Sequence, residues 1–204
     1  MKVLVSIFGR LFYIPYRLAV RFEKERNLKI VKKLMTIAES SKIAESAKIR
    51  NFQNDRTKII LGSKTMLMGE LLVFKHGGQI EIGNDCFIGE GTRIWSAKNI
   101  TIGNRVLIAH NVNIHDQISH PLDSKIRHDD YKLIFEKGLQ DNVDYNEKEV
   151  VIEDDVWIGF NVTILKGVKI GKGAIIGADT LIAENVPAFA VVIGNPARII
   201  KYTT

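Results

Sequence analysis

Cysteine is almost absent from this chain of 204 residues, which contains one, Cys86. A single cysteine excludes an internal disulfide framework and is compatible with a reducing compartment. Cys86 stands four residues after Ile82, at a small inward position of the repeat described below. This position predicts a packed core thiol rather than a nucleophile.

An uninterrupted apolar run is also missing. A membrane-spanning helix needs about 20 consecutive apolar residues, and Arg10, Pro15, Arg17 and Arg21 interrupt the apolar segment 3–22. The segment shows neither the unbroken apolar centre nor the small-residue cleavage site of a secretory signal. We therefore predict a cytoplasmic protein.

An excess of positive charge is missing beyond the first quarter of the chain, although the net charge is +6. Residues 1–50 hold twelve Lys and Arg against four Asp and Glu, and the rest of the chain has a small acidic excess. Because the basicity is local, no nucleic-acid partner is expected for the main body.

A six-residue spacing of large apolar residues dominates what is present. It runs through Ile82, Ile88 and Ile94, then Ile102, Ile108 and Ile114, then Ile152, Ile158, Ile164, Ile170, Ile176 and Ile182. No helix repeats at six, whereas short strands wound into a β-helix do. We predict an all-β fold, a parallel β-helix over residues 43–204, whose aliphatic side chains form interior columns. Glycine often follows the aliphatic residue, which fits a corner with positive φ or close backbone approach.

Residues 1–42 are predicted to be a basic helical segment with a break near Pro15. Two interpretations remain open. The segment could cap the open end of the repeat stack. Alternatively, residues 1–35 could touch the inner membrane face, since aromatic side chains such as Phe12 and Tyr16 lie among arginines.

The longest interruption of the repeat is an excursion predicted over residues 115–149. The phase calls for an aliphatic residue at position 120, and the chain supplies His120 followed by Pro121. About thirty polar residues then follow before the repeat restarts at Val150. Long irregular loops are usually functional or disordered, so the excursion is the predicted functional region.

Several motifs give the chain a specific resemblance. They are Ile118-Ser119-His120-Pro121-Leu122-Asp123, Val156-Trp157-Ile158-Gly159, Leu165-Lys166-Gly167-Val168-Lys169-Ile170-Gly171, Ile176-Gly177-Ala178 and Gly194-Asn195-Pro196-Ala197-Arg198. Over about residues 80–204 the sequence resembles the hexapeptide-repeat sugar O-acetyltransferases, which act on maltose, galactosides, O-antigen or capsule. The resemblance implies a left-handed β-helix, a homotrimer with active sites between subunits, and acetyl-CoA as acyl donor, with no metal.

Within that resemblance, His120 is the predicted general base. Acetyl transfer to a saccharide hydroxyl requires removal of a proton from a very weak acid, and histidine is suited to this near neutral pH. Asp116, four residues earlier, is a candidate partner that would fix the tautomer of His120. A backbone carbonyl could orient the ring instead.

The resemblance also assigns cofactor residues. Pantetheine contacts carry over onto Trp157, Gly159, Phe160 and Ala178, and the phosphates would meet Arg198 and Lys201. Many relatives have Thr-Lys before Asp-Val-Pro, but this chain has Ala183-Glu184 before Asn185-Val186-Pro187. One cationic contact of the family is therefore lost or replaced.

Two other classes of protein remain possible. The spacing His110-x-x-x-x-His115 resembles that of the β-helical carbonic anhydrases, but a zinc site needs a third ligand, and residues 90–98 contain no histidine. A non-catalytic assembly module would need neither a base nor paired cations. Under the acetyltransferase interpretation, His110 and His115 line the acceptor pocket, and the acceptor is a precursor of a cell-surface polysaccharide. Tyr131, Phe135 and Tyr145 of the excursion could stack on a sugar ring.

Overall fold

The computed structural model describes residues 16, 18–19, 26, 29–138 and 145–203. Two compact units divide the chain, residues 1–33 and 34–204. The described residues of the first unit are helical. Most of the segment assigned above to a cap or a membrane contact lies outside the described residues, so both interpretations stay predictions. No helix in the described part of the chain has the length and hydropathy to cross a bilayer.

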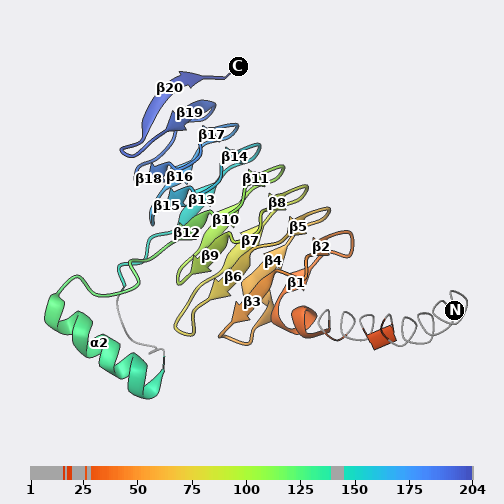
Figure 1. Ribbon diagram of the computed structural model, residues 1–204, viewed down its shortest axis with the longest axis vertical. Helices are drawn as coiled ribbons and strands as arrows, with labels where there is room; N and C mark the ends of the chain where they lie inside the picture. Colours follow the sequence, from red (N-terminus) through yellow and green to blue (C-terminus); the bar gives the residue numbers. More distant parts are fainter. Residues whose placement is uncertain (1–15, 17, 20–25, 27–28, 139–144, 204) are drawn as a thin grey trace, which may run out of the picture. The chain divides into compact units, whose positions relative to one another are not determined.

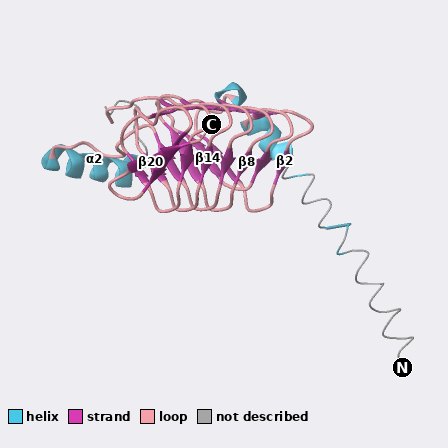
Figure 2. Ribbon diagram, turned by 90° about the horizontal axis from the view of Figure 1, so that it is seen from above, coloured by secondary structure: helices cyan, strands magenta, loops and turns pink. Residues whose placement is uncertain are grey.

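Three parallel sheets form the second unit, with strands stacked coil upon coil (Figures 1 and 2). Sheet A consists of β1 (Thr36–Ile37), β4 (Ile59–Leu61), β7 (Ile80–Ile82), β10 (Ile100–Ile102), β13 (Val150–Ile152) and β16 (Lys169–Ile170). Sheet B consists of β2 (Lys42–Ile43), β5 (Met66–Leu67), β8 (Phe87–Ile88), β11 (Leu107–Ile108), β14 (Trp157–Ile158), β17 (Ile175–Ile176), β19 (Ala190–Ile193) and β20 (Arg198–Tyr202). Sheet C consists of β3 (Lys48–Asn51), β6 (Glu70–Val73), β9 (Arg93–Ser96), β12 (Asn113–His115), β15 (Thr163–Ile164) and β18 (Leu181–Ile182).

Successive turns of the chain place one strand in each sheet, which is the predicted β-helix. Its first strand, β1, begins seven residues before the start predicted at residue 43. Among the described strands only the last pair, β19 and β20, is antiparallel, and it closes the C-terminal end as a hairpin. Within the described residues of the second unit, η1 (Arg56–Lys58) and α2 (Ser124–Lys137) are helical elements outside the sheets.

The interior columns are the isoleucines of the six-residue repeat. In sheet A, Ile82 pairs with Ile102, Ile102 with Ile152, and Ile152 with Ile170. All four side chains are at most 1% exposed. Burying each one contributes about 1.5–3 kcal/mol, which explains why the phase is held so strictly.

Close backbone approach, rather than positive φ, explains the glycines that follow the aliphatic residues. A Cβ added at Gly83 would lie 2.6 Å from the carbonyl oxygen of Gly103 in the next coil. The positive-φ corners are instead occupied by residues such as Asp85, Arg105 and Asp155. Cys86 is buried, 3% exposed, as predicted for a core thiol.

The excursion leaves the stack between β12 and β13 without disturbing the register (Figure 1). The backbone N–H of Val150 donates to the carbonyl of Asn99 at 3.0 Å, and β13 then pairs with β10. The excursion contains a regular helix, α2, which the sequence pattern did not predict. Asp123 caps α2 by accepting hydrogen bonds from the backbone N–H groups of Lys125 and Ile126.

Candidate functional site

Backbone hydrogen bonds fasten both ends of the excursion to the β-helix. Ile118 donates to the carbonyl of Tyr145 at 3.2 Å, and Lys148 donates to the carbonyl of Asp116 at 2.8 Å. The Lys166 ammonium, which comes from the next coil, donates to the carbonyl of Asn146 at 2.7 Å. The two ends therefore converge at one place beside sheet C.

A tight turn at this place presents His120. Its backbone N–H donates to the carbonyl of Ile118 at 2.8 Å, and the intervening Ser119 has φ of 65°. A backbone hydrogen bond from one residue to the carbonyl two residues earlier, with positive φ at the residue between them, is typical of the classic γ-turn. This type of turn is rare and strained. The Gln117 side chain accepts from the N–H of Ser119 at 2.7 Å and supports the turn. Such strain persists where the surroundings impose it, often at functional sites.

The imidazole of His120 has a carboxylate partner, Asp130 of α2. His120 Nδ1 lies 3.3 Å from Asp130 Oδ2, and the Tyr145 hydroxyl donates to Asp130 Oδ1 at 3.2 Å. The His120 side chain is 48% exposed, whereas that of Asp130 is 3% exposed. Burial raises the pKa of Tyr145 to about 12, and the charge of Asp130 acts in the same direction. Tyr145 is therefore a hydrogen-bond donor at neutral pH.

Asp116, the predicted partner of His120, has a different role. Its side chain is fully buried and accepts hydrogen bonds from the Ser96 hydroxyl at 2.6 Å and from the N–H groups of Ala97 and Lys98 at 2.8 and 2.9 Å. Both oxygens are thus used inside the coil. The expected pairing with His120 is replaced by the pairing of His120 with Asp130, because a spacing of four residues places two side chains together on a helix but not across this turn.

The six-residue repeat predicted an inward-facing residue at position 120, and this prediction is also corrected. His120 does not take the place of an inward aliphatic residue, since it lies outside the coil on the turn. The inward polar residue where the coil is interrupted is Asp116. Sequence reasoning thus found the interruption but misplaced the residue that fills the interior.

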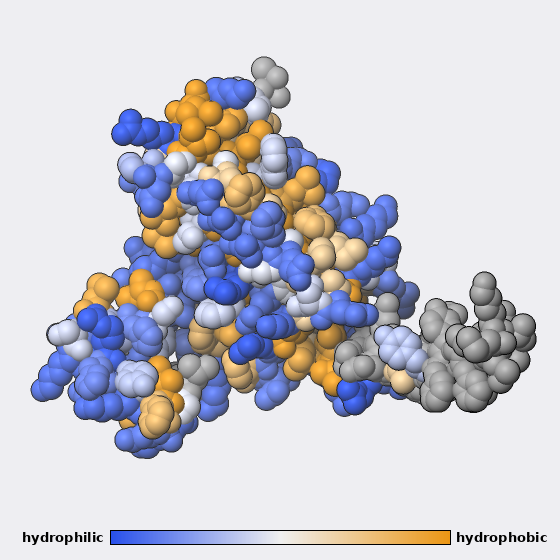
Figure 3. Space-filling model, in the orientation of Figure 1, coloured by the Kyte–Doolittle hydropathy of each residue, from blue (hydrophilic) through white to orange (hydrophobic). Residues whose placement is uncertain are grey.

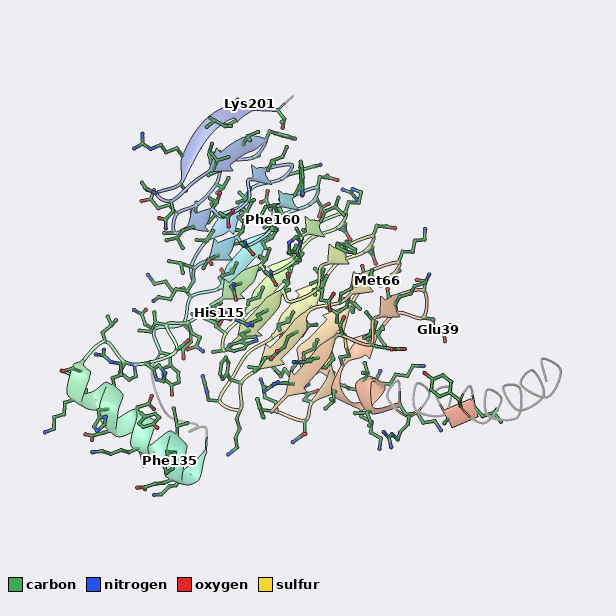
Figure 4. All side chains as sticks on the ribbon, in the orientation of Figure 1. Glu39, Met66, His115, Phe135, Phe160 and Lys201 are labelled. Carbon is green, nitrogen blue, oxygen red and sulfur yellow. The ribbon has the colours of Figure 1, made fainter. Side chains whose placement is uncertain are left out.

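His115 and His110 occupy different surroundings. The His115 ring stacks on Trp95 of β9 with 5.0 Å between centroids, and the His110 ring stacks on Phe160 at 5.2 Å. Burial lowers the pKa of His115, and its Nε2 atom is buried without a hydrogen-bond partner. Figure 4 labels His115 on the side of the excursion and Phe160 on another part of the stack.

A pocket of about 450 Å³ adjoins the turn that carries His120. Its lining consists of Asn113, His115, Gln117, Ile118, Ser119, Thr163, Ile164, Leu165 and Lys166. Amide, hydroxyl, imidazole and ammonium groups stand there beside aliphatic side chains, a mixture that suits a polar ligand with apolar faces. His115 therefore lines the pocket beside the turn that carries His120, whereas His110 is not among its lining residues. The role of both residues in binding an acceptor stays a prediction.

The predicted pantetheine residues fall into two groups. A Cβ added at Gly159 would lie 2.7 Å from the backbone nitrogen of Ala178, so these two residues are in contact, and Phe160 follows directly. Trp157 lies on the outer face of sheet B and is 54% exposed. The backbone of the next coil thus fills the space that a side chain at Gly159 would need.

Arg198 and Lys201 lie on β20, opposite Ile193 and Val191 of β19. Apolar side chains gather around the same end of the stack (Figure 3), where Ile193, Ile199 and Ile200 are 44–53% exposed. Cations beside an apolar surface fit the phosphates and ring of a nucleotide. A second pocket of about 380 Å³ reaches this hairpin and includes Glu184, Asn185 and Asn195.

Among the residues that the structure describes, no three His, Cys, Asp or Glu side chains form a group able to hold a metal ion. His110 and His115 are each stacked on a separate aromatic ring. The ligand spacing considered for zinc thus corresponds to two distinct ring stacks.

Sequence reasoning missed Asp130 and Trp95, and it gave Tyr145 a different role, stacking on a sugar ring. Asp130 belongs to the charge cluster Arg127-His128-Asp129-Asp130. The sequence alone does not show which of the two neighbouring carboxylates is buried. The Asp123 cap and Gly138 after the last turn are helix-boundary signals that could have predicted α2.

Comparison with known proteins supports the repeat. Residues 149–184 match the family profile described as bacterial transferase hexapeptide (six repeats). The matched residues span the strands from β13 to β18, which carry the six-residue repeat. The chain is 34% identical over 140 residues to a galactoside O-acetyltransferase of Lactococcus lactis, a match that covers 58% of this chain and 61% of that protein. It is 58% identical over 52 residues to a 2,3,4,5-tetrahydropyridine-2,6-dicarboxylate N-acetyltransferase of Staphylococcus aureus, covering 26% and 22% of the two chains. This chain thus spans less than two thirds of the length of these curated relatives.

Solved structures confirm the left-handed β-helix. The N-acyltransferase AntD of Bacillus cereus, solved as a point mutant with dTDP-4-amino-4,6-dideoxyglucose and coenzyme A, superposes with a TM-score of 0.65 at 19% identity, covering 88% of this chain and 89% of AntD. The acetyltransferase VCA0836 of Vibrio cholerae, solved with acetyl coenzyme A, gives 0.58 at 24% identity, covering 89% and 78%. Because both sequence identities are below 25%, the structural similarity establishes the fold of this chain and nothing more.

Proposed function

We propose that this protein transfers an acetyl group from acetyl-CoA to a hydroxyl of a saccharide, with His120 as general base. The observation that carries the proposal is the strained turn that presents His120 beside a pocket, with Asp130 on its Nδ1 atom. A histidine held in this way has its Nε2 atom available to accept a proton. The names of the relatives agree with acetyl transfer, and that of the Lactococcus protein with a sugar acceptor.

In the proposed mechanism, acyl transfer takes place in two steps. The oxygen of the acceptor hydroxyl forms a bond to the thioester carbonyl carbon, and His120 Nε2 takes the proton of that hydroxyl at the same time. The imidazolium then returns this proton to the departing thiolate as the carbon–sulfur bond breaks. Asp130 stabilises the positive charge that the ring carries between the two steps.

Acetyl-CoA, when bound, supplies the activated acyl group. Gly159, Phe160 and Ala178 would hold the pantetheine arm, Trp157 would pack against it, and Arg198 and Lys201 would meet the phosphates. The exposed cations of the hairpin suit the phosphates of such a ligand.

The acceptor pocket proposed here is the one beside His120. Asn113, Gln117, Ser119 and Thr163 offer hydrogen-bonding groups for sugar hydroxyls, and Leu165 offers an apolar wall. Among the excursion aromatics, Tyr131 and Phe135 are exposed, while Tyr145 is buried against Asp130 and is not free to stack on a sugar. A precursor of a cell-surface polysaccharide remains the proposed acceptor.

A homotrimer with active sites between subunits is part of the proposal. The outer face of sheet B carries an in-register apolar ladder, Met66, Phe87, Leu107, Trp157 and Ile175. Phe87, Leu107 and Trp157 are 39%, 50% and 54% exposed. Contiguous exposed apolar surface of this kind marks an interface, and Trp157 would then lie where two subunits meet.

The test is thiol release from acetyl-CoA with a panel of free, nucleotide-linked and lipid-linked saccharides. Replacing His120 with Ala should lower kcat/KM by about 10²–10⁴, because the base is lost. His128→Ala, which removes an exposed histidine of the same excursion, is the matched control and should keep parental activity. Activity of His120→Ala within threefold of the parent would contradict the proposal, and stoichiometric zinc in active protein would favour a metalloenzyme.

A further inference from the structure

The helix α2 buries an unusual residue. Its fourteen residues contain one buried side chain, and that side chain is the carboxylate of Asp130. The large apolar residues of α2 lie at the surface, with Ile126, Leu133 and Phe135 exposed by 59%, 39% and 81%. A helix that only packed against the body would bury these residues and leave the carboxylate in water.

Burying a carboxylate is costly unless hydrogen bonds or opposite charge compensate. Asp130 has both of its oxygens used, one by His120 Nδ1 at 3.3 Å and the other by the Tyr145 hydroxyl at 3.2 Å. Its rotation is thereby fixed from two sides. Asp130 is consequently aligned with His120 rather than merely near it.

Both partners come from the excursion, and both are held in place. Asp130 is in the interior of a helix capped by Asp123 at one end and ended by Gly138 at the other. The backbone of Tyr145 is bonded to Ile118, two residues before His120. The excursion therefore carries the base and the two residues that orient it.

We infer that Asp130 and Tyr145 are positioning residues for His120, so that α2 delivers the group that fixes the base. This inference rests on the proposed function. A carboxylate at Nδ1 keeps the proton on that nitrogen and leaves Nε2 as the acceptor. An amide in the same place would have one acceptor and one donor for two partners, and its donor would favour the opposite tautomer of His120.

The kinetic test compares Asp130→Asn with Asp129→Asn. Asp129 is the exposed neighbouring carboxylate on α2, where it pairs with Lys132. Asp130→Asn should lower kcat by about 10²–10⁴ with KM within threefold, and Asp130→Glu should restore part of that loss. Asp129→Asn should match the parent in kcat and KM.

Tyr145→Phe removes one hydroxyl and keeps the ring, so kcat should fall by about three- to tenfold, the equivalent of one hydrogen bond. Tyr16→Phe is its control and should keep the parental kcat, because Tyr16 is exposed and lies in the first unit, outside the excursion. In the His120→Ala background, Asp130→Asn should cause no further loss, since the residues act as one unit. Nitrogen-15 NMR of the His120 ring should show the Nε2-acceptor tautomer in the parent and a changed tautomer in Asp130→Asn.

The outcomes separate the two proposals. Parental activity of His120→Ala would remove His120 as the base and with it the proposed mechanism. If His120→Ala is inactive while folded Asp130→Asn keeps parental kcat, or shows the parental ring tautomer, the proposed function stands and the inference is wrong. An unfolded Asp130→Asn would leave Tyr145→Phe to decide, and parental kcat in that variant would also contradict the inference.

Discussion

At the scale of single residues, the neighbouring buried groups of His115 and Asp116 differ in how they are hydrogen-bonded. Asp116 is buried and fully hydrogen-bonded, whereas the Nε2 atom of His115 is buried and unpaired. The cost of burying a charged imidazole lowers the pKa of His115, with Arg93 adding to the effect and Asp116 opposing it. Native His115 is therefore more resistant to protonation than His115 of the unfolded chain.

This difference predicts a pH dependence of stability. Below the unfolded pKa of about 6.5, the unfolded chain binds a proton that the native protein does not, so the free energy of unfolding falls as the pH decreases. The loss is at most about 1.4 kcal/mol per pH unit and ends below the native pKa. His115→Phe keeps a ring against Trp95 and cannot titrate, so its urea midpoint should fall less than the parental one between pH 7.5 and 5.5. Equal falls in the two proteins would show that other groups carry the pH dependence.

At the scale of elements, the excursion and the β-helix are joined but structurally separable. The hydrogen bond from Val150 to Asn99 continues sheet A as though the intervening residues were absent. The helix α2 contributes a carboxylate to His120 but no buried apolar side chain. The interior columns of the β-helix therefore do not depend on α2.

Replacing residues 119–144 with a short glycine linker should preserve the β-helix and abolish acetyl transfer. The β-sheet circular dichroism and a cooperative thermal transition should remain, because the interior columns are untouched. Activity should fall at least as far as in His120→Ala. A shortened protein that fails to fold would show that the excursion is required to close the stack.

How far the sequence predicts these elements depends on which side chains face the core. The interior isoleucines repeat every six residues, so Ile158, Ile164, Ile170 and Ile176 could all be placed correctly from spacing alone. The helix α2 was not predicted, since its apolar residues lie at the surface and leave no periodic core face. Its partner for His120 was missed for the same reason, because Asp116 is adjacent in sequence but Asp130 is adjacent in space.

The residues assigned to the cofactor illustrate an intermediate case. The contact between Gly159 and Ala178 follows from the coil spacing, since each lies at the same corner of successive coils. The location of Arg198 and Lys201 on an antiparallel hairpin does not follow from it, because the six-residue phase ends before β20. Their role as phosphate contacts stays a prediction.

At the scale of the whole molecule, the apolar ladder on sheet B is the main argument for assembly. Strand pairing aligns its side chains, so one substitution alters a continuous surface. Leu107 is at the centre of the ladder and is 50% exposed.

Leu107→Glu should convert the proposed trimer into monomers, as measured by light scattering after size-exclusion chromatography, because a charge would be buried without a partner. Phe135→Glu changes an apolar residue on α2 that is more exposed than Leu107, and it should leave the oligomeric mass unchanged. If the sites lie between subunits, Leu107→Glu should also lose activity while keeping its secondary structure. A parental protein that is monomeric at micromolar concentration would contradict the trimer.

The uninterrupted pairing of β13 with β10 has a consequence for how the proposed acceptor preference could change. A coil that closes in the same register with or without an inserted segment tolerates exchange of that segment as a unit. The base, its orienting carboxylate and one edge of the pocket would be exchanged together, while the donor-binding surface stayed as it was. Under the proposed function, transplanting residues 117–149 between related scaffolds should change the acceptor while the acyl donor stays the same.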